Sequence, residues 1–162
     1  MVHNKISVIR AGAAQADTAF SLIEEYYEAI GVVVRDDRAA LEHYLARPDE
    51  SPIFLASVGQ VPAGCVMLRG LPQVTENGTE NDARADEVKR LYVRPPFRGR
   101  GLAYALMQAA EEDARRRGRA WLYLDTKDDL DAAIRFYRAT GYTDCPRYND
   151  NPQATIFLRK RL

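Results

Sequence analysis

The residues best suited to bind an anion form a short glycine-containing loop in the second half of the chain. This loop, Arg98-Gly99-Arg100-Gly101-Leu102-Ala103, follows a strand-like stretch that ends at Pro95-Pro96, and a helix-like stretch follows it. The first turn of a helix has unpaired N–H groups and the positive end of the helix dipole, which together hold phosphate oxygens. Gly99 and Gly101 keep side chains away from those amides. The loop therefore indicates a phosphate site, with an ordinary glycine-assisted turn as the alternative.

Carboxylates and tyrosines must supply acid–base chemistry, because His3 and His43 are the only histidines. Glu87 opens one strand-like stretch, and Asp125 closes another. Tyr137 lies on the apolar stripe of the last predicted helix, and a phenol with a pKa of about 10 stays protonated at neutral pH and can donate a proton. Each residue also has a structural interpretation: an exposed strand glutamate, a turn-capping aspartate and a core tyrosine.

Composition and charge narrow the class of protein. The 162 residues, 46% of them hydrophobic, suffice for one domain with a single core. The formal net charge is zero, which argues against a protein that coats polyanions. Residues 1–87 carry seven basic and fourteen acidic side chains, whereas residues 88–162 carry sixteen and nine. An anionic ligand is therefore expected on the second half.

The cysteines and the hydropathy bear on location and partners. Cys65 and Cys145 lie in no metal-binding cluster, so we expect no metal and a reducing compartment. No apolar run approaches the ~18 residues of a membrane span, and residues 1–10 lack the layout of a signal peptide. We expect a cytoplasmic protein that does not bind a membrane.

A basic run offers a rival function, nucleic-acid binding. Arg115-Arg116-Arg117 and Arg119 stand at the end of a predicted helix, where cations complement the helix dipole. No aromatic–basic RNA motif accompanies them. We therefore expect no nucleic-acid partner.

Hydrophobic periodicity predicts the elements that position these residues. Strands are predicted at 5–10, 53–58, 63–68, 87–93, 121–124, 142–143 and 154–158, and helices at 13–30, 36–46, after 101 to about 117, and 130–141. Asp36 or Asp37 is expected to cap the second helix. The polar segment 73–84 lacks a period and predicts an exposed, mobile loop. The order strand, helix, helix, three strands, helix, strand, helix, two strands predicts one mixed α/β domain over residues 1–162.

Four blocks of sequence resemble a known family. The loop at 98–103 matches the (Arg/Gln)-x-x-Gly-x-(Gly/Ala) acyl-CoA signature of the GNAT superfamily of N-acetyltransferases. Glu87–Val93, Leu124–Thr126 and Ala133–Tyr142 stand around it in the order and spacing of that family. The segment Tyr148-Asn149-Asp150-Asn151-Pro152 is similar to a bacterial subgroup of small members. The likeness extends along almost the entire chain.

This resemblance implies a mixed, mostly antiparallel central sheet flanked by helices, and it implies acetyl-CoA as the co-substrate. Backbone amides of the loop would hold the pyrophosphate, and the strand backbone would pair with pantetheine and hold the oxyanion. The implied cofactor-binding residues are Leu91, Tyr92, Val93, Arg98, Gly99, Arg100, Gly101, Leu102, Ala103, Phe136 and Tyr137. For Arg94 and Arg100, phosphate contact and plain solvation are both open. Tyr137 would be the general acid and Glu87 the general base.

The acceptor side is implied less directly. Tyr26, Tyr27, Asp125, Tyr148 and Asn149 are expected to line an acceptor pocket, beside the segment 73–84. Leu130 stands where many relatives have an asparagine, so a side-chain contact to CoA is expected to be absent there. The expected reaction is transfer of an acetyl group to a primary amine of a small molecule or peptide. A non-catalytic acyl-CoA-binding regulatory module is the alternative, and a homodimer stays open.

Overall fold

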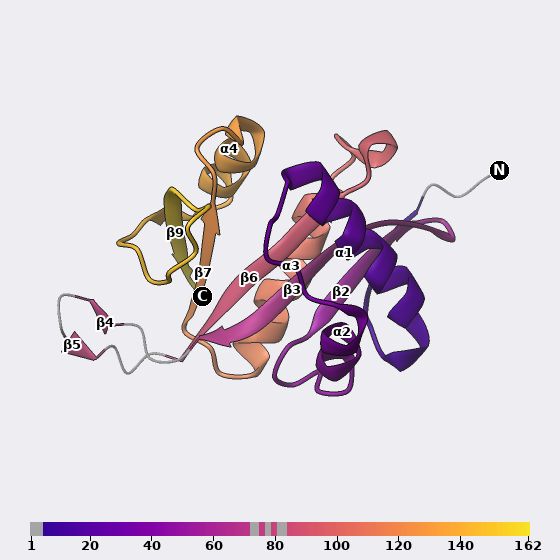
Figure 1. The fold of residues 1–162 in the computed structure, drawn as a ribbon, viewed down its shortest axis with the longest axis horizontal. Helices are drawn as coiled ribbons and strands as arrows, with labels where there is room; N and C mark the ends of the chain where they lie inside the picture. The colour runs from indigo at the N-terminus through magenta and orange to yellow at the C-terminus, as the bar shows by residue number, and fades with distance from the viewer. Residues whose placement is uncertain (1–4, 72–74, 77–78, 81–83) are drawn as a thin grey trace. The chain divides into compact units, whose positions relative to one another are not determined.

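The computed structural model describes residues 5–71, 75–76, 79–80 and 84–162, and Figure 1 shows its course. Internal contacts divide the chain into two compact units. The first unit comprises Met1–Arg69 and Val88–Asp113, and the second comprises Gly70–Glu87 and Ala114–Leu162. The single domain expected from the sequence stays a prediction, and each unit is described by itself.

Strands and helices follow one another in the predicted order, except that two short strands within the segment 73–84 were not predicted. The strands are β1 (Ile6–Arg10), β2 (Ile53–Val58), β3 (Val61–Leu71), β4 (Thr75–Glu76), β5 (Thr79–Glu80), β6 (Ala85–Val93), β7 (Trp121–Thr126), β8 (Thr143–Asp144) and β9 (Ile156–Arg161). The helices are α1 (Ala16–Ile30), α2 (Arg38–Leu45), α3 (Leu102–Arg116) and α4 (Asp131–Ala139), with short 3₁₀ turns η1 (Ala13–Gln15) and η2 (Pro95–Phe97). Seven strands form one sheet in the order β1-β2-β3-β6-β7-β9-β8. The predicted mixed α/β fold with a mostly antiparallel sheet is confirmed.

A glycine ends α1, and an aspartate cap begins α2. α1 stops at Gly31, whose φ of +72° suits glycine and whose N–H donates to the Tyr27 carbonyl at 2.9 Å. α2 begins after Asp37, whose carboxylate accepts the N–H of Ala40 at 2.9 Å. Of the two predicted caps, the structure therefore selects Asp37. In the described part of the chain, no helix has the length and apolar character needed to cross a membrane.

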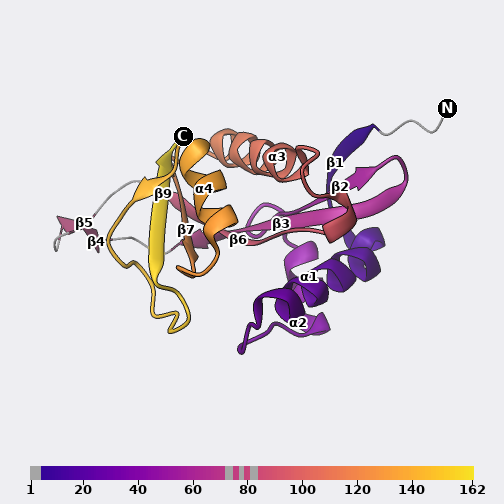
Figure 2. The same cartoon turned by 90° about the horizontal axis from the view of Figure 1, so that it is seen from above.

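The first unit is covered by helices on both faces. α1 and α2 bury Leu22, Tyr27 and Leu41 in one core cluster with Leu55 and Met67 of the strands. Figure 2 shows α3 on the opposite side of these strands. Because both faces of the strands are covered, β2 is a nearly continuous buried run rather than an alternating one.

In the second unit, β7 pairs with a strand on each side. Its residues Trp121–Tyr123 run parallel to Ala85–Glu87 of β6, and Glu87 stands opposite Tyr123. All of β7 pairs antiparallel with β9, from Trp121 opposite Arg161 to Thr126 opposite Ile156. This register places Glu87 opposite Tyr123, two residues before Asp125, so two of the predicted acid–base residues lie on neighbouring strands.

Several predicted boundaries were wrong. The last strand, β9, runs over 156–161 instead of 154–158, because Arg159 and Arg161 continue the ladder while their guanidinium groups lie over the Trp121 ring, 4.7 and 5.9 Å from its centroid. β3 is longer than the predicted 63–68. Within the predicted loop 73–84, β4 and β5 pair with each other, and residues 73–74, 77–78 and 81–83 lie outside the described part of the chain.

At one position in β3, two backbones approach so closely that only glycine fits there. A Cβ placed on Gly64 would lie 2.6 Å from the carbonyl oxygen of Tyr92, which is too short for any real contact. On the same strand, a Cβ on Gly70 would meet nothing nearer than 4.0 Å. Hence β3 tolerates a side chain at position 70 but not at position 64.

We expect Gly64→Ala to lower the free energy of unfolding by ~1–3 kcal/mol, because the strand carrying Tyr92 must move aside. Urea unfolding followed by circular dichroism measures the change. Gly70→Ala is the matched control and should be neutral or slightly stabilising, since alanine reduces the entropy of the unfolded chain. Equal stability of the two variants would show that the backbone contact at Gly64 is unimportant.

Candidate active site

The glycine-containing loop has the backbone geometry that its sequence predicts. Gly99 and Gly101 adopt φ values of +74° and +86°, in the left-handed region that residues with a Cβ rarely occupy. No other described group lies within 4 Å of the place where either Cβ would stand. The chain then enters the 15-residue helix α3, whose first turn includes the bond from the Ala105 N–H to the Gly101 carbonyl. The loop therefore presents open backbone at the positive end of a long helix.

The two arginines of this loop are exposed, but each contacts a neighbouring group. Arg98 donates its Nε–H to the Val93 carbonyl at 2.9 Å, and its guanidinium carbon lies 6.0 Å from the centroid of the Tyr92 ring. Arg100 lies over the Phe97 ring at 5.7 Å. These contacts fasten the loop to the end of β6. We therefore expect the predicted anion site to depend on backbone amides more than on these arginine side chains.

Arg94 has a different role from the two that the sequence left open. Its Nη2 and Nε donate to the Glu25 carboxylate at 2.7–3.1 Å, and its Nη1 donates to the Pro62 carbonyl at 2.8 Å. The hydrogen bond with Arg94 lowers the pKa of Glu25. Arg94 is therefore neither solvated nor aimed at a phosphate, but joins β6 to α1.

Strand β6 supplies the backbone at Leu91–Val93. Burial raises the pKa of Tyr92, and the neighbouring Glu25 carboxylate adds to this effect. One residue earlier than this segment, Arg90 has a φ of +56°, and it is the single non-glycine residue with positive φ in the described part of the chain. No sequence pattern indicates this backbone conformation, because an arginine in an alternating strand resembles an ordinary exposed residue.

The second unit brings together several of the predicted site residues. Asn149 donates its Nδ2 hydrogens to Glu87 Oε2 at 3.1 Å and to Asp125 Oδ2 at 2.6 Å. Its Oδ1 accepts the backbone N–H of Asn151 at 3.1 Å. Glu87 is only 4% exposed. The Asn149 amide is thus fully used in bridging two carboxylates, which makes it a clamp rather than a direct contact for an acceptor.

Tyr148 stands beside the same two carboxylates. Its ring packs edge-on against Tyr123 and Phe157, with centroids 5.1 and 5.6 Å away. Burial raises the pKa of Tyr148 well above its ordinary value, and the charges of Glu87 and Asp125 raise it further. Among the described residues, none gives its buried hydroxyl a well-aligned hydrogen bond. Tyr148 therefore keeps a proton that it can donate in a hydrogen bond.

Tyr137 lies where the helical spacing predicts, on the buried face of α4. It is 8% exposed and packs against Phe136 and Tyr142, with ring centroids 5.6 and 5.9 Å away. Leu130 precedes α4 without a side-chain cap. Packing therefore holds the Tyr137 ring in place. The hydroxyl is the only polar group of that side chain.

The two tyrosines predicted for the acceptor pocket differ in their surroundings. Tyr26 is half-buried, whereas Tyr27 is 1% exposed. The Tyr27 hydroxyl accepts hydrogen bonds from Arg90 Nε at 2.7 Å and from the Asp36 N–H at 3.2 Å. Tyr27 thus belongs to an internal polar network with Arg90 and Asp36. The sequence analysis considered Asp36 only as a helix cap and did not single out Arg90.

A mixed sheet with open glycine backbone before a long helix defines the fold class of the N-acetyltransferases. The model of the acetyltransferase (GNAT) family matches residues 17–142, well over half of the chain. The chain belongs to the GNAT acetyltransferase family.

Individual relatives agree with this assignment. The chain is 31% identical over 143 residues to an uncharacterized N-acetyltransferase of Lactobacillus delbrueckii subsp. lactis, covering 86% of this chain and 79% of the relative. It is 38% identical over 77 residues to an uncharacterized N-acetyltransferase of Schizosaccharomyces pombe, covering 47% of each. The match thus spans about half the length of the Schizosaccharomyces pombe relative. A match to an uncharacterized N-acetyltransferase of Methanocaldococcus jannaschii covers 43% of that protein.

A solved structure shares the fold. The PaiA N-acetyltransferase from Thermoplasma acidophilum, in complex with coenzyme A, has a TM-score of 0.75 at 14% identity, covering 98% of this chain and 99% of that one. This likeness holds for the fold alone.

The bridging role of Asn149 predicts a pH-dependent difference between two variants. Asn149→Ala removes the donor shared by two carboxylates and should lower the free energy of unfolding by ~1–3 kcal/mol. Asn149→Asp adds a third carboxylate, whose folded-state pKa should rise above its unfolded value of about 3.9. A raised pKa favours folding below the unfolded value and loses that contribution as the pH rises.

We therefore expect the Asp variant to be clearly less stable than the Ala variant at pH ~8 and to approach it near pH ~4. Urea unfolding at several pH values measures the difference. A constant difference across this range would show that position 149 does not lie between the two carboxylates.

Proposed function

We propose that this chain is an N-acetyltransferase that moves an acetyl group from acetyl-CoA to a primary amine of a small molecule or peptide. The observation that carries the proposal is the open glycine backbone at Gly99 and Gly101, directly before α3. Backbone amides there suit the pyrophosphate of CoA, because they combine N–H donors with the positive end of a helix dipole. Membership of the GNAT family and a related fold solved with coenzyme A support the same cofactor.

In the proposed mechanism, the backbone of Leu91–Val93 accepts the pantetheine chain as an additional strand. One amide of this segment donates to the oxygen that becomes negative when the amine attacks the thioester carbonyl. Such a donor is effective because it is already oriented before the reaction. The chain's own backbone thus binds both the cofactor and the developing charge.

Two side chains would move the protons. Glu87 is the proposed base, because it is a buried carboxylate held by the Asn149 amide. It removes a proton from the amine, directly or through water, while Asp125 is the second candidate for this role. Tyr137 then gives its proton to the departing CoA thiolate. Tyr148 is proposed to donate a hydrogen bond to the acceptor from its place beside the carboxylates.

Two rival functions, acyl-CoA binding without catalysis and nucleic-acid binding, would require other properties of the protein. A non-catalytic acyl-CoA-binding module would bind CoA without acetylating any amine. A nucleic-acid-binding surface would need its arginines outward, but Arg117 and Arg119 form ion pairs with the fully buried Asp86 at 2.5 and 2.9 Å. We propose a cytoplasmic location, because the sequence has only two cysteines and they form no disulfide with each other.

CoA binding tests the proposal directly. CoA at 100 times its dissociation constant should stabilise the protein by ~2.7 kcal/mol. Gly101→Val should remove most of this stabilisation, because valine both strains the positive φ and covers the amides. Thermal unfolding with and without CoA measures the shift.

Gly118→Val is the matched control for that experiment. Gly118 also has a positive φ, +76°, and open space at its Cβ position, but it lies at the other end of α3. The two variants should lose similar stability without CoA, and only Gly101→Val should lose the response to CoA. Absence of any shift of the unmodified protein in millimolar CoA would refute the proposed function.

Tyr137→Phe tests the general acid. The change keeps the packed ring and removes the hydroxyl, so the rate of the chemical step should fall by ~10²-fold, the lower end of the usual range for such groups. A thiolate with a pKa of about 8.5 is already a tolerable leaving group, which limits the loss. Single-turnover kinetics with acetyl-CoA measures the step.

Tyr142→Phe serves as control, because the Tyr142 ring packs directly on Tyr137 and is also buried. That variant should keep its rate. An unchanged rate in Tyr137→Phe as well would leave Tyr137 as a packing residue only.

A further inference from the structure

Arg90 is held in an unfavourable backbone conformation in the middle of a strand. Its φ of +56° lies in the left-handed region, where the Cβ crowds the following carbonyl. In a strand this conformation also turns the two adjoining peptide groups out of the extended arrangement. The distortion directly precedes Leu91–Val93, the segment proposed to bind pantetheine and the oxyanion.

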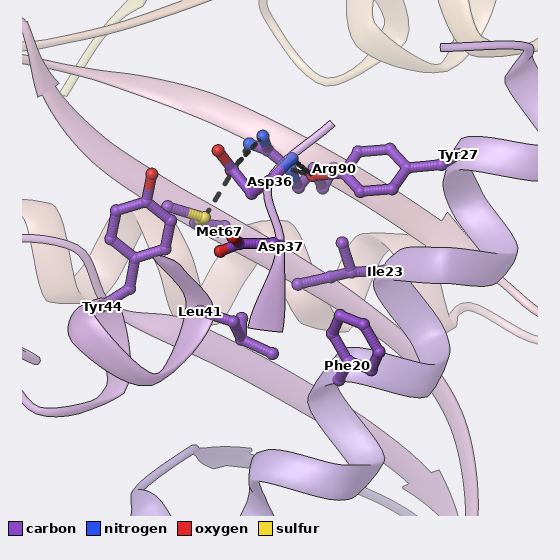
Figure 3. A pocket seen from close by; sticks show the side chains of 9 residues that line it. All are labelled: Phe20, Ile23, Tyr27, Asp36, Asp37, Leu41, Tyr44, Met67 and Arg90. Carbon is purple, nitrogen blue, oxygen red and sulfur yellow. Dashed lines mark hydrogen bonds and ion pairs between the residues drawn. The ribbon is translucent and has the colours of Figure 1, made fainter. Parts of the chain in front are cut away.

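The Arg90 side chain is fixed by groups from two other parts of the first unit. Its Nε donates to the Tyr27 hydroxyl of α1 at 2.7 Å, and its Nη2 donates to Asp36 Oδ2 at 2.5 Å (Figure 3). The guanidinium carbon lies 5.4 Å from the centroid of the Tyr27 ring, and only 11% of the side chain is exposed. Asp36 stands in the connection between α1 and α2. The side chain therefore ties that connection to β6.

The backbone of the same residue is fixed from β3. The thiol of Cys65 donates to the Arg90 carbonyl at 3.4 Å. Complete burial raises the pKa of Cys65 to about 12, so the thiol keeps the proton that it donates. Arg90 is thus held at both its carbonyl and its guanidinium group.

The space around this network is too small for a substrate. The cavity bordered by Arg90, Asp36, Tyr27 and Tyr44 measures about 10 Å³, which is at the lower limit for one water molecule. Figure 3 shows the guanidinium group turned toward Asp36 and Tyr27. The network is therefore a packed support, not a pocket. Strained residues persist only where their surroundings enforce them, and they concentrate at functional sites.

We propose that Arg90 is a positioning residue for acetyl transfer: its anchored side chain holds the β6 distortion that orients the amides of Leu91–Val93. This inference rests on the proposed function. Asp36 and Tyr27 act through Arg90, so the α1–α2 connection and the thioester-binding backbone are set together. Loss of the anchor should misorient the amides while leaving the pyrophosphate loop at Gly99–Ala103 intact.

Arg90→Met tests the proposal, because methionine fills much of the volume and makes none of the guanidinium hydrogen bonds. We expect kcat to fall by about 10²-fold, as for other small displacements of catalytic groups, while the dissociation constant for CoA changes by less than about threefold. Tyr27→Phe removes one hydroxyl only and should reduce kcat in the same direction. If Arg90→Met fails to fold, the Tyr27→Phe variant still tests the proposal.

Amide NMR spectra of ¹⁵N-labelled protein supply a readout that does not need an acceptor amine. In the unmodified protein, acetyl-CoA should shift the resonances of both Leu91–Val93 and Gly99–Ala103. In Arg90→Met, the shifts at 91–93 should change in pattern while those at 99–103 persist. Arg38→Met is the control: Arg38 forms ion pairs with Asp17 and Glu42 but is exposed, and its loss should alter neither region.

The outcomes separate this inference from the function on which it rests. Unchanged shifts at 91–93 and an unchanged kcat in Arg90→Met would overturn the role of Arg90 and leave the proposed function standing. Loss of shifts at both regions in a folded variant would also overturn it, because Arg90 would then support CoA binding as a whole. Absence of any shift in the unmodified protein would refute the proposed function itself.

Discussion

Strand β6 is the constraint on which the candidate chemistry depends, since its residues must hold a distorted backbone and a buried carboxylate in one continuous segment. Two arginine–aspartate networks fix it. In the second unit, Asp86 is fully buried and paired with Arg117 and Arg119. In the first unit, Arg90 is paired with Asp36. Removing one partner of such a buried pair costs more than the pair contributes, so the strand has little freedom to relax.

The proposed binding of an anion would depend on backbone amides more than on basic side chains. The second half of the sequence carries an excess of arginines, yet Arg94 is committed to Glu25 and Arg98 to the Val93 carbonyl. What remains open is the glycine backbone before α3. Amides on a rigid turn are oriented in advance, whereas a long arginine side chain loses conformational entropy when it binds. The charge asymmetry therefore predicts which half of the chain holds the site without identifying the groups that form it.

The sequence predicts the features that depend on neighbours along the chain. Periodicity gave the helices and most strands, the Asp37 cap follows from its own local turn, and the glycines of the loop have the positive φ that their placement suggests. The missed features depend on distant partners. Arg94 meets Glu25 across 69 residues, and Arg90 meets Asp36 across 54. No local pattern encodes such pairs, and the same holds for Asn149, whose two carboxylate partners lie on different strands.

The charges around Tyr148 bear on which of the two candidate tyrosines in the second unit, Tyr137 or Tyr148, could act as the general acid. Tyr148 is buried beside Glu87 and Asp125, and both burial and these charges oppose formation of its phenolate. A general acid must lose its proton in the transition state, so a phenol whose anion is destabilised in this way is a poor proton donor to sulfur. It remains a good hydrogen-bond donor, because that role requires no ionisation. Tyr137 packs between the Phe136 and Tyr142 rings. The electrostatics around Tyr148 therefore oppose its acting as the general acid and suit the role proposed for it, a hydrogen-bond donor that orients the acceptor.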